Sequence, residues 1–103
     1  MAAAIAALVI VGCGGSSGAS QDDKDKAIAA AKFIYAGKAN EDLSAGPCLS
    51  EGIPGLSDWV VDIAHDPRQA VDDQPANQCR SFRDGETHHF VELTPDGQLI
   101  RAE

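Results

Sequence analysis

The distribution of charge along the chain indicates that only its last ~80 residues can form a folded domain. Residues 2–13, AAAIAALVIVGC, are an uninterrupted run of apolar and small residues, and residues 14–20 contain only glycine, serine and alanine. Every charged residue lies from Asp22 onward, so the formal net charge of −8 belongs wholly to the C-terminal part. A domain of this size has a thin core, which is commonly reinforced by a covalent crosslink.

The apolar run is too short to cross a bilayer, since a helix needs roughly 20 residues to do so. A run of roughly 7–15 apolar residues followed by small ones is typical of a secretory signal peptide. An ordinary cleaved signal and a buried N-terminal helix remain as alternatives. Residues 10–13, Ile-Val-Gly-Cys, resemble the lipobox of bacterial lipoproteins. The resemblance implies that residues 1–12 are removed and that Cys13 is lipidated as the first mature residue.

A short linker follows the cysteine. Residues 13–21 are rich in glycine and serine, and such segments behave as flexible coil. A tether directly after a lipid anchor would let residues 22–103 stand off a membrane as a small acidic domain. We therefore expect a chain on the extracytoplasmic side of the cell membrane or outer membrane, held there by lipid. The acidic balance excludes nucleic acid as a partner, because phosphate binding needs clustered lysine and arginine.

Three cysteines occur in the chain. Once the resemblance assigns Cys13 to lipid, Cys48 and Cys79 remain as an even pair. In an oxidising compartment, such a pair in a small domain predicts a disulfide. Closing a loop of 31 residues would contribute roughly 3–4 kcal/mol in the chain-entropy model. Two free buried thiols are the alternative.

The domain begins with a helix signal. Ser20 stands three residues before an acidic side chain, the pattern of a capping box, and further aspartates occupy the expected first turn. Ile28, Ala31 and Tyr35 then recur at helical spacing, so one apolar stripe should face the core. Gly37 predicts the end of the helix.

Strand patterns dominate the rest of the chain. Residues 44–57 are interrupted by glycine and proline and predict a loop. Residues 58–65 alternate as a strand with the Trp59 side inward. Residues 80–83 and 86–93 predict a hairpin around Asp84-Gly85, and a second turn at 93–97 leads to a last strand at 98–102. Phe82, Phe90 and Leu99 are further core candidates.

These elements predict an α+β fold. One N-terminal helix should pack on an antiparallel sheet of three or four strands, with one disulfide. A short helical turn near residues 69–71 is compatible with the polar connection at 68–78. Aspartates 72 and 73 with Asn77 invite a calcium interpretation, but the alternating ligands and central glycine of an EF-hand loop are missing.

The histidines offer the best case for chemistry. If strands 58–65 and 86–93 are neighbours, two histidines and two carboxylates could approach each other as a zinc-type site. That candidate set is Asp62, His65, His88 and Glu92. The adjacent pair at 88–89 cannot point to one face together, so polar residues on a solvated sheet face are the alternative.

No catalytic motif stands out. None of Ser44, Ser50, Ser57 and Ser81 stands in a GxSxG elbow, and the sequence has no Walker loop and no GxGxxG. A domain this small also leaves little room for a deep pocket. We therefore expect a non-catalytic binding domain without a cofactor, whose partner is an envelope protein or a wall component. The alternative is a metal-binding or metal-dependent enzymatic domain that uses His65, His88 and the neighbouring carboxylates.

Overall fold

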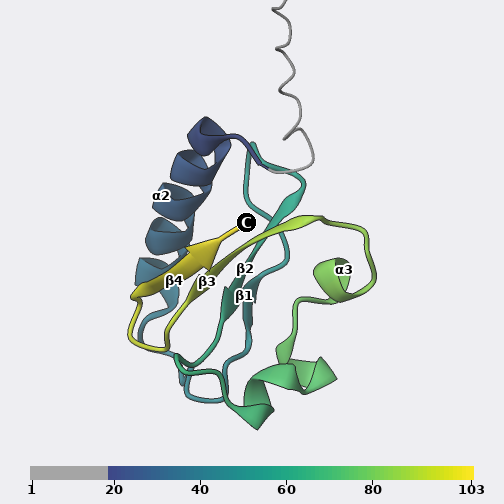
Figure 1. Ribbon diagram of the computed structural model, residues 1–103. Coiled ribbons are helices and arrows are strands. Elements are labelled where there is room, and N and C mark those ends of the chain that lie inside the picture. The colour runs from purple at the N-terminus through teal and green to yellow at the C-terminus, as the bar shows by residue number, and fades with distance from the viewer. Residues whose placement is uncertain (1–18) are drawn as a thin grey trace, which may run out of the picture.

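The computed structural model describes residues 19–103. The predicted signal peptide at 1–12 and the lipidated Cys13 lie outside the described residues. The fold is α+β, with one long helix, a four-stranded sheet and one disulfide, as the sequence predicted (Figure 1). The elements are α2 (Gln21–Lys38), β1 (Cys48–Ser50), β2 (Trp59–Ile63), η1 (Ala70–Asp73), η2 (Pro75–Asn77), α3 (Arg80–Arg83), β3 (His89–Leu93) and β4 (Leu99–Ala102).

Helix α2 begins where the capping pattern placed it. The Ser20 hydroxyl accepts a hydrogen bond from the backbone N–H of Asp23 at 3.1 Å. Ala27 and Ala31 are fully buried, so the helix approaches the sheet closely through small side chains. It runs through Gly37 and ends at Lys38, whose ammonium donates to the Leu49 carbonyl at 2.7 Å. Within the described range, no helix combines the length and apolar character needed to cross a membrane.

The sheet is mixed. Its order is β1-β2-β3-β4, with antiparallel outer pairs and a parallel central pair of β2 and β3. Trp59 pairs with His89 and Ile63 with Leu93, so the two central strands run in register. Parallel neighbours need a long crossover, and residues 64–88 provide it. This crossover contains η1, η2 and α3, and it lies on the side of the sheet opposite α2 (Figure 1).

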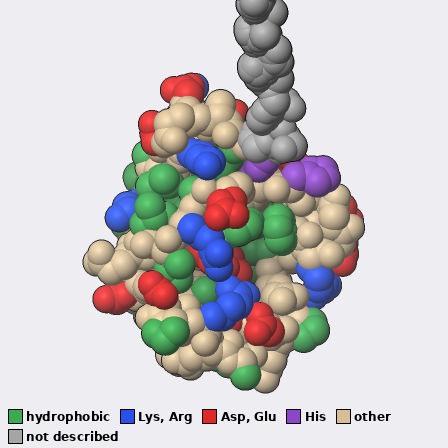
Figure 2. All heavy atoms as spheres, viewed as in Figure 1, with side chains coloured by type: hydrophobic (Ala, Val, Ile, Leu, Met, Phe, Trp, Pro, Cys, Tyr) green, Lys and Arg blue, Asp and Glu red, His purple; other side chains and the backbone are tan. Residues whose placement is uncertain are grey.

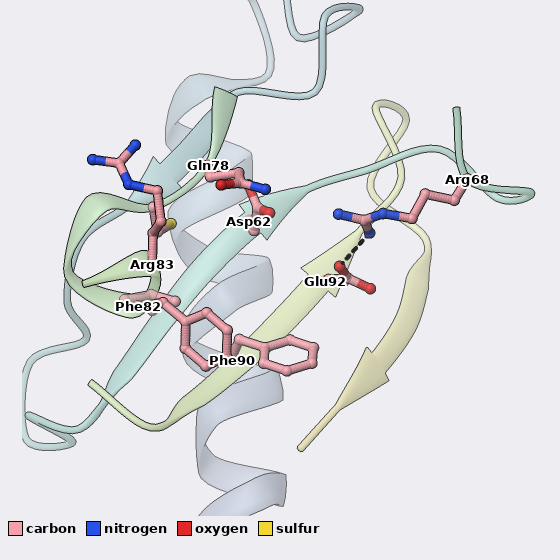
Figure 3. Close-up of a pocket in the computed structure, with 9 residues that line it drawn as sticks. Asp62, Arg68, Gln78, Phe82, Arg83, Phe90 and Glu92 are labelled. Carbon is pink, nitrogen blue, oxygen red and sulfur yellow. Dashed lines mark hydrogen bonds and ion pairs between the residues drawn. The ribbon is translucent and has the colours of Figure 1, made fainter. Parts of the chain in front are cut away.

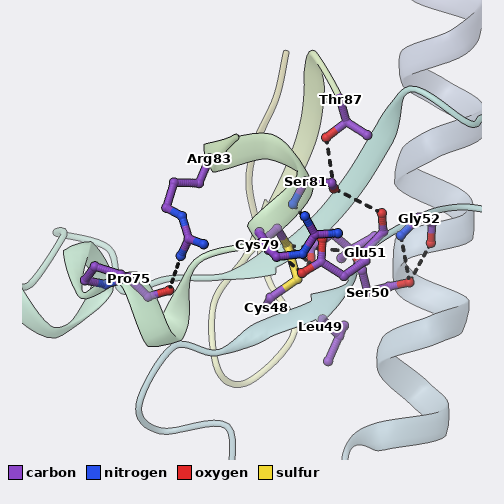
Figure 4. Close-up of a disulfide and its surroundings, with 12 residues drawn as sticks. Cys48, Leu49, Ser50, Glu51, Gly52, Pro75, Cys79, Ser81, Arg83 and Thr87 are labelled. Carbon is purple, nitrogen blue, oxygen red and sulfur yellow. Dashed lines mark hydrogen bonds between the residues drawn. A yellow bond between two sulfur atoms is a disulfide. The ribbon is translucent and has the colours of Figure 1, made fainter. Parts of the chain in front are cut away.

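The predicted hairpin around Asp84-Gly85 is wrong, because its first arm forms the helical turn α3. The Glu51 carboxylate accepts hydrogen bonds from the backbone N–H groups of Arg80 at 2.8 Å and Ser81 at 2.9 Å. These are donors that a helix N-terminus leaves free, so Glu51 caps the turn from another part of the chain. Cys79, the residue immediately before α3, is held in place by its disulfide to Cys48 (Figure 4). A strand at 80–83 would lose these contacts.

Alternation along the central strands gives the sheet two different faces. The helix-covered face carries Trp59, Val61, Ile63, Val91 and Leu93, each at most 2 % exposed. Trp59 therefore belongs to the core, as predicted. The opposite face, which we call the open face, carries the alternate residues Val60, Asp62, Phe90 and Glu92, because side chains alternate along a strand.

Two predicted core residues are exposed instead. Phe82 is 40 % exposed because it lies on α3, outside the sheet, and Leu99 is 41 % exposed on the edge strand β4. The second predicted turn does form. Gly97 adopts a φ of +91° in that turn, and a Cβ there would lie 2.6 Å from the Tyr35 ring. Glycine is therefore needed both for its backbone conformation and for the close approach of α2.

Candidate ligand-binding cavity

A cavity of about 340 Å³ opens on the open face of the sheet. Strands β2 and β3 form its floor, and α3 with the crossover forms its wall (Figure 3). Its volume lies at the lower end of the range of small-molecule sites in proteins. The lining residues are Val60, Asp62, Arg68, Gln78, Cys79, Phe82, Arg83, Phe90 and Glu92.

One side of the cavity is apolar. The rings of Phe82 and Phe90 meet edge to face, with centroids 5.2 Å apart and planes at 75°. Val60, 1 % exposed, lies beside Phe90 across the pair of central strands. Covering exposed aromatic and aliphatic surface with an apolar ligand group lowers the free energy of the complex. This side therefore suits an apolar or aromatic group.

Asp62 supplies the unusual polar group. Burial of its carboxyl raises the pKa to about 8, and the adjacent Glu92 carboxylate adds to the rise. Desolvation and a nearby like charge both disfavour the ionised form. Its buried Oδ1 has no hydrogen-bond partner within the described chain. Asp62 is therefore a mainly protonated acid at pH 7, with an oxygen that a ligand could engage.

Glu92, its neighbour in register, has its oxygens occupied. Oε2 accepts from Nη1 of Arg68 and Oε1 accepts from Nε of Arg101, both at 2.9 Å. Arg68 also donates through Nε to Asp73 at 2.9 Å. Figure 3 shows the Arg68–Glu92 pair beside Asp62. The ion-pair network thus satisfies both oxygens of Glu92 but does not reach Oδ1 of Asp62.

The remaining polar lining residues have protein partners. Nη1 of Arg83 donates to the Pro75 carbonyl at 2.9 Å (Figure 4). Its guanidinium points away from Asp62 (Figure 3), and the Gln78 amide donates to the Asp73 carbonyl at 3.4 Å. Basic and acidic side chains intermingle beside hydrophobic ones on the surface in Figure 2. The open face is therefore a mixed surface without one dominant charge.

The structure does not bring the four predicted metal ligands together. Asp62 and Glu92 are paired in register, but the histidines lie near opposite ends of the central strands. Nδ1 of His65 lies 2.9 Å from Asp72, and Nδ1 of His88 lies 2.9 Å from Asp58. Antiparallel neighbours would place the end of one strand beside the start of the next. The parallel pairing separates these two positions instead.

Other metal-type groups also have protein partners. Among residues 19–103, three potential ligands cluster at Cys48, Glu51 and Cys79. Both sulfurs belong to the disulfide and cannot act as thiolates, so this cluster is no metal site. Asp72, weighed above for calcium, accepts from the backbone N–H groups of His65 and Gln69, at 3.0 and 2.9 Å. These bonds lower its pKa despite burial and give it a structural role.

Comparison with known proteins adds no functional assignment. No protein-family model, no curated protein sequence and no solved structure is significantly similar to the chain. The cavity itself must therefore carry the functional argument. Sequence reasoning selected Asp62 and Glu92 but missed the aromatic pair and Arg68. Asp62 stands among the apolar residues of strand 59–63, and a long polar segment follows at 68–78. These two features were the available sequence signal for a buried acid with a polar segment packed over it.

Proposed function

We propose that this chain is a lipid-anchored extracytoplasmic protein whose small domain binds another molecule without catalysis. The observation that carries the proposal is the open-face cavity, where apolar surface adjoins the Oδ1 of Asp62 that is unpartnered in the described chain. The partner would be an envelope protein or a wall component that inserts a group there. The anchor would be in the cell membrane or the outer membrane.

The location is supported by two independent features. The lipobox-like residues 10–13 precede a glycine- and serine-rich linker, as an anchored domain requires. Cys48 and Cys79 form a disulfide, and such bonds persist mainly in oxidising compartments. The first feature concerns the N-terminus and the second concerns the folded domain. Their agreement favours export over a cytosolic location.

Binding is favoured over catalysis by the chemistry of the cavity. Its described lining contains no histidine, serine or free thiol that could serve as a nucleophile–base pair. His65 and His88 instead contact aspartates near the ends of the strands. Asp62 can exchange a proton, but both oxygens of the neighbouring Glu92 carboxylate are held by Arg68 and Arg101, which leaves no free nucleophile beside it among the described residues. The arrangement suits recognition of a donor group.

The anchor is tested by metabolic labelling with an alkyne fatty acid in bacterial cells. We expect the wild-type chain to carry the label, to sediment with membranes and to have an intact mass that starts at Cys13 plus acyl groups. The Cys13→Ser variant, which keeps Cys48 and Cys79, should lose the label. An unprocessed wild-type chain with free thiols would contradict the proposed location.

Binding is tested by a photo-crosslinking amino acid placed at Phe82 beside the cavity. The matched control is the same amino acid at Phe33, which is 82 % exposed on α2. We expect a reproducible crosslinked species in cells from position 82 alone, and its loss when Val60→Trp fills the cavity. Equal products from both positions, or none from position 82, would contradict binding at the open face.

A further inference from the structure

We propose that the open-face cavity binds a small organic cation, whose N–H groups donate to Asp62 and whose apolar body lies against Phe82 and Phe90. The proposal rests on the binding function above and specifies its ligand class. Amidinium, guanidinium and protonated amine groups on an aromatic or aliphatic body belong to this class.

The geometry calls for a donor. The Oδ1 atom of Asp62 is buried and has no hydrogen-bond partner in the described chain. A buried polar atom without a partner costs about 1–3 kcal/mol, which a donor from a ligand would recover. Gln78 and Arg68 line the cavity, but their recorded hydrogen bonds run to Asp73 and Glu92. In its ionised form the carboxyl only accepts hydrogen bonds, so a ligand N–H would supply the missing partner.

The charges around Asp62 favour a cationic donor. Glu92 on β3 and Asp72 on η1 are the negative groups that raise its pKa, and Arg68 opposes them. Arg68 is itself paired with Asp73 and Glu92. The guanidinium of Arg83 on α3 turns toward the Pro75 carbonyl, and Arg101 on β4 is paired with Glu92. Arg68 and Arg101 are therefore engaged by other carboxylates, and a carboxylate formed at Asp62 would lack a cationic partner of its own in the described chain. The net charge of −8 also favours a cation over an anion.

The apolar side of the cavity fits the body of such a ligand. The edge-to-face pair of Phe82 and Phe90 offers aromatic surface next to the acid. A cation held within about 6 Å of an aromatic ring gains further attraction from the ring electrons. A volume of about 340 Å³ accommodates one aromatic ring with a cationic head. Both parts of the ligand therefore have a matching surface.

Binding should release a proton. In the empty cavity the Asp62 carboxyl is mainly protonated at pH 7, because its pKa is about 8. A cation stabilises the carboxylate, so the acid loses its proton to solvent as the ion pair forms and charge is conserved. Below the pKa, affinity should therefore rise by up to about tenfold per pH unit. An anionic ligand would show the opposite trend.

The test is titration calorimetry of the full chain carrying Cys13→Ser with three matched probes. Benzamidinium, benzamide and benzoate share one ring and present a cationic, a neutral and an anionic head. We expect benzamidinium to bind with a Kd on the order of 1 mM at pH 7, at least tenfold more tightly than the other two. Its affinity should rise several-fold from pH 6 to pH 7, with heats that depend on buffer ionisation.

Two variants locate the effect. Asp62→Asn should weaken benzamidinium binding at least tenfold and abolish its pH dependence. Asp25→Asn makes the same substitution on the exposed surface of α2 and should leave binding within twofold. Phe82→Ala, at a partly exposed site where folding is retained, should weaken binding several-fold and keep the pH dependence.

Specific outcomes would overturn the ligand class. Tighter binding of benzoate, with affinity that falls as pH rises, would assign the cavity to anions through Arg68. Equal binding of benzamide and benzamidinium would show that charge is not recognised. No binding of any probe, together with retained crosslinking at position 82 in cells, would overturn the cation proposal while leaving the proposed binding function intact.

Discussion

The two faces of the central strands differ although they are built from alternate residues of the same segments. On the helix-covered face, Val61, Ile63, Val91 and Leu93 are fully buried. One residue away on the open face, Asp62 and Glu92 place two carboxyl groups side by side. One pair of strands thus carries a fully packed face and a face that lines a cavity, because side chains alternate between the two sides of a strand.

The coverings of the two faces differ in the same way. Helix α2 packs closely because Ala27 and Ala31 face the sheet with small side chains. The crossover at 64–88 covers the open face through short turns, a disulfide and ion pairs, and it leaves the cavity. Close packing leaves no room for a ligand, whereas a looser polar cover does. The predictions below test this contrast.

The largest expected effect comes from removing the disulfide that holds the crossover. The double variant Cys48→Ala and Cys79→Ala should lower the free energy of unfolding by about 4 kcal/mol, because the bond closes a loop between residues 31 apart in sequence. Urea denaturation of this variant against Cys13→Ser, which keeps the bond, measures the loss. A change below about 1 kcal/mol would mean that other contacts hold the crossover.

A truncation on each face should separate the two surfaces. Leu93→Ala removes a fully buried side chain from the helix-covered face and should cost about 3 kcal/mol. Phe82→Ala removes a larger side chain beside the cavity, but this side chain is 40 % exposed, so the cost should stay near 1 kcal/mol. Equal losses in urea denaturation would contradict the division into a stabilising and a recognising face.

The acid on the open face should make stability depend on pH. Asp62 has a pKa of about 8 in the folded chain and about 4 when unfolded, so only the folded state holds its proton between these values. The stability that the protonated carboxyl contributes is full below pH ~4 and is lost as pH rises through 8. Wild-type stability should fall by about 2 kcal/mol from pH 6 to pH 8, relative to Asp62→Asn. Parallel profiles of unfolding free energy would contradict the raised pKa.

The smallest expected effect concerns zinc and the ends of the strands. Since His65 and His88 contact different aspartates near opposite ends of the central pair, neither should join the carboxylates of the open face in binding a metal. Equilibrium dialysis should show zinc affinity unchanged within twofold in His65→Ala and His88→Ala. A loss of at least tenfold in both variants would support the predicted metal site and would contradict the separation of the two histidines from the open face.

Features that depend only on neighbouring residues could be predicted from the sequence. The cap at Ser20, the buried alanines of α2, the alternation along β2 and the turn before Gly97 all follow from local spacing and backbone preference. The α+β class and the cysteine pair followed from the order and number of such signals. Asp62 and Glu92 were also recognised, although as metal ligands. Interactions between residues close in sequence were sufficient to predict these features, because each helix, strand or turn has its own residue pattern.

Tertiary structure alone decided how these elements meet. A turn of four residues such as α3 has little helical preference of its own, and it forms where Glu51 caps it from 29 residues away. The crossover makes the central strands parallel, which separates His65 from His88 and pairs Asp62 with Glu92. The raised pKa of Asp62 then results from burial beneath that crossover. These properties depend on contacts between distant segments, because desolvation and strand direction are fixed only when the chain has packed.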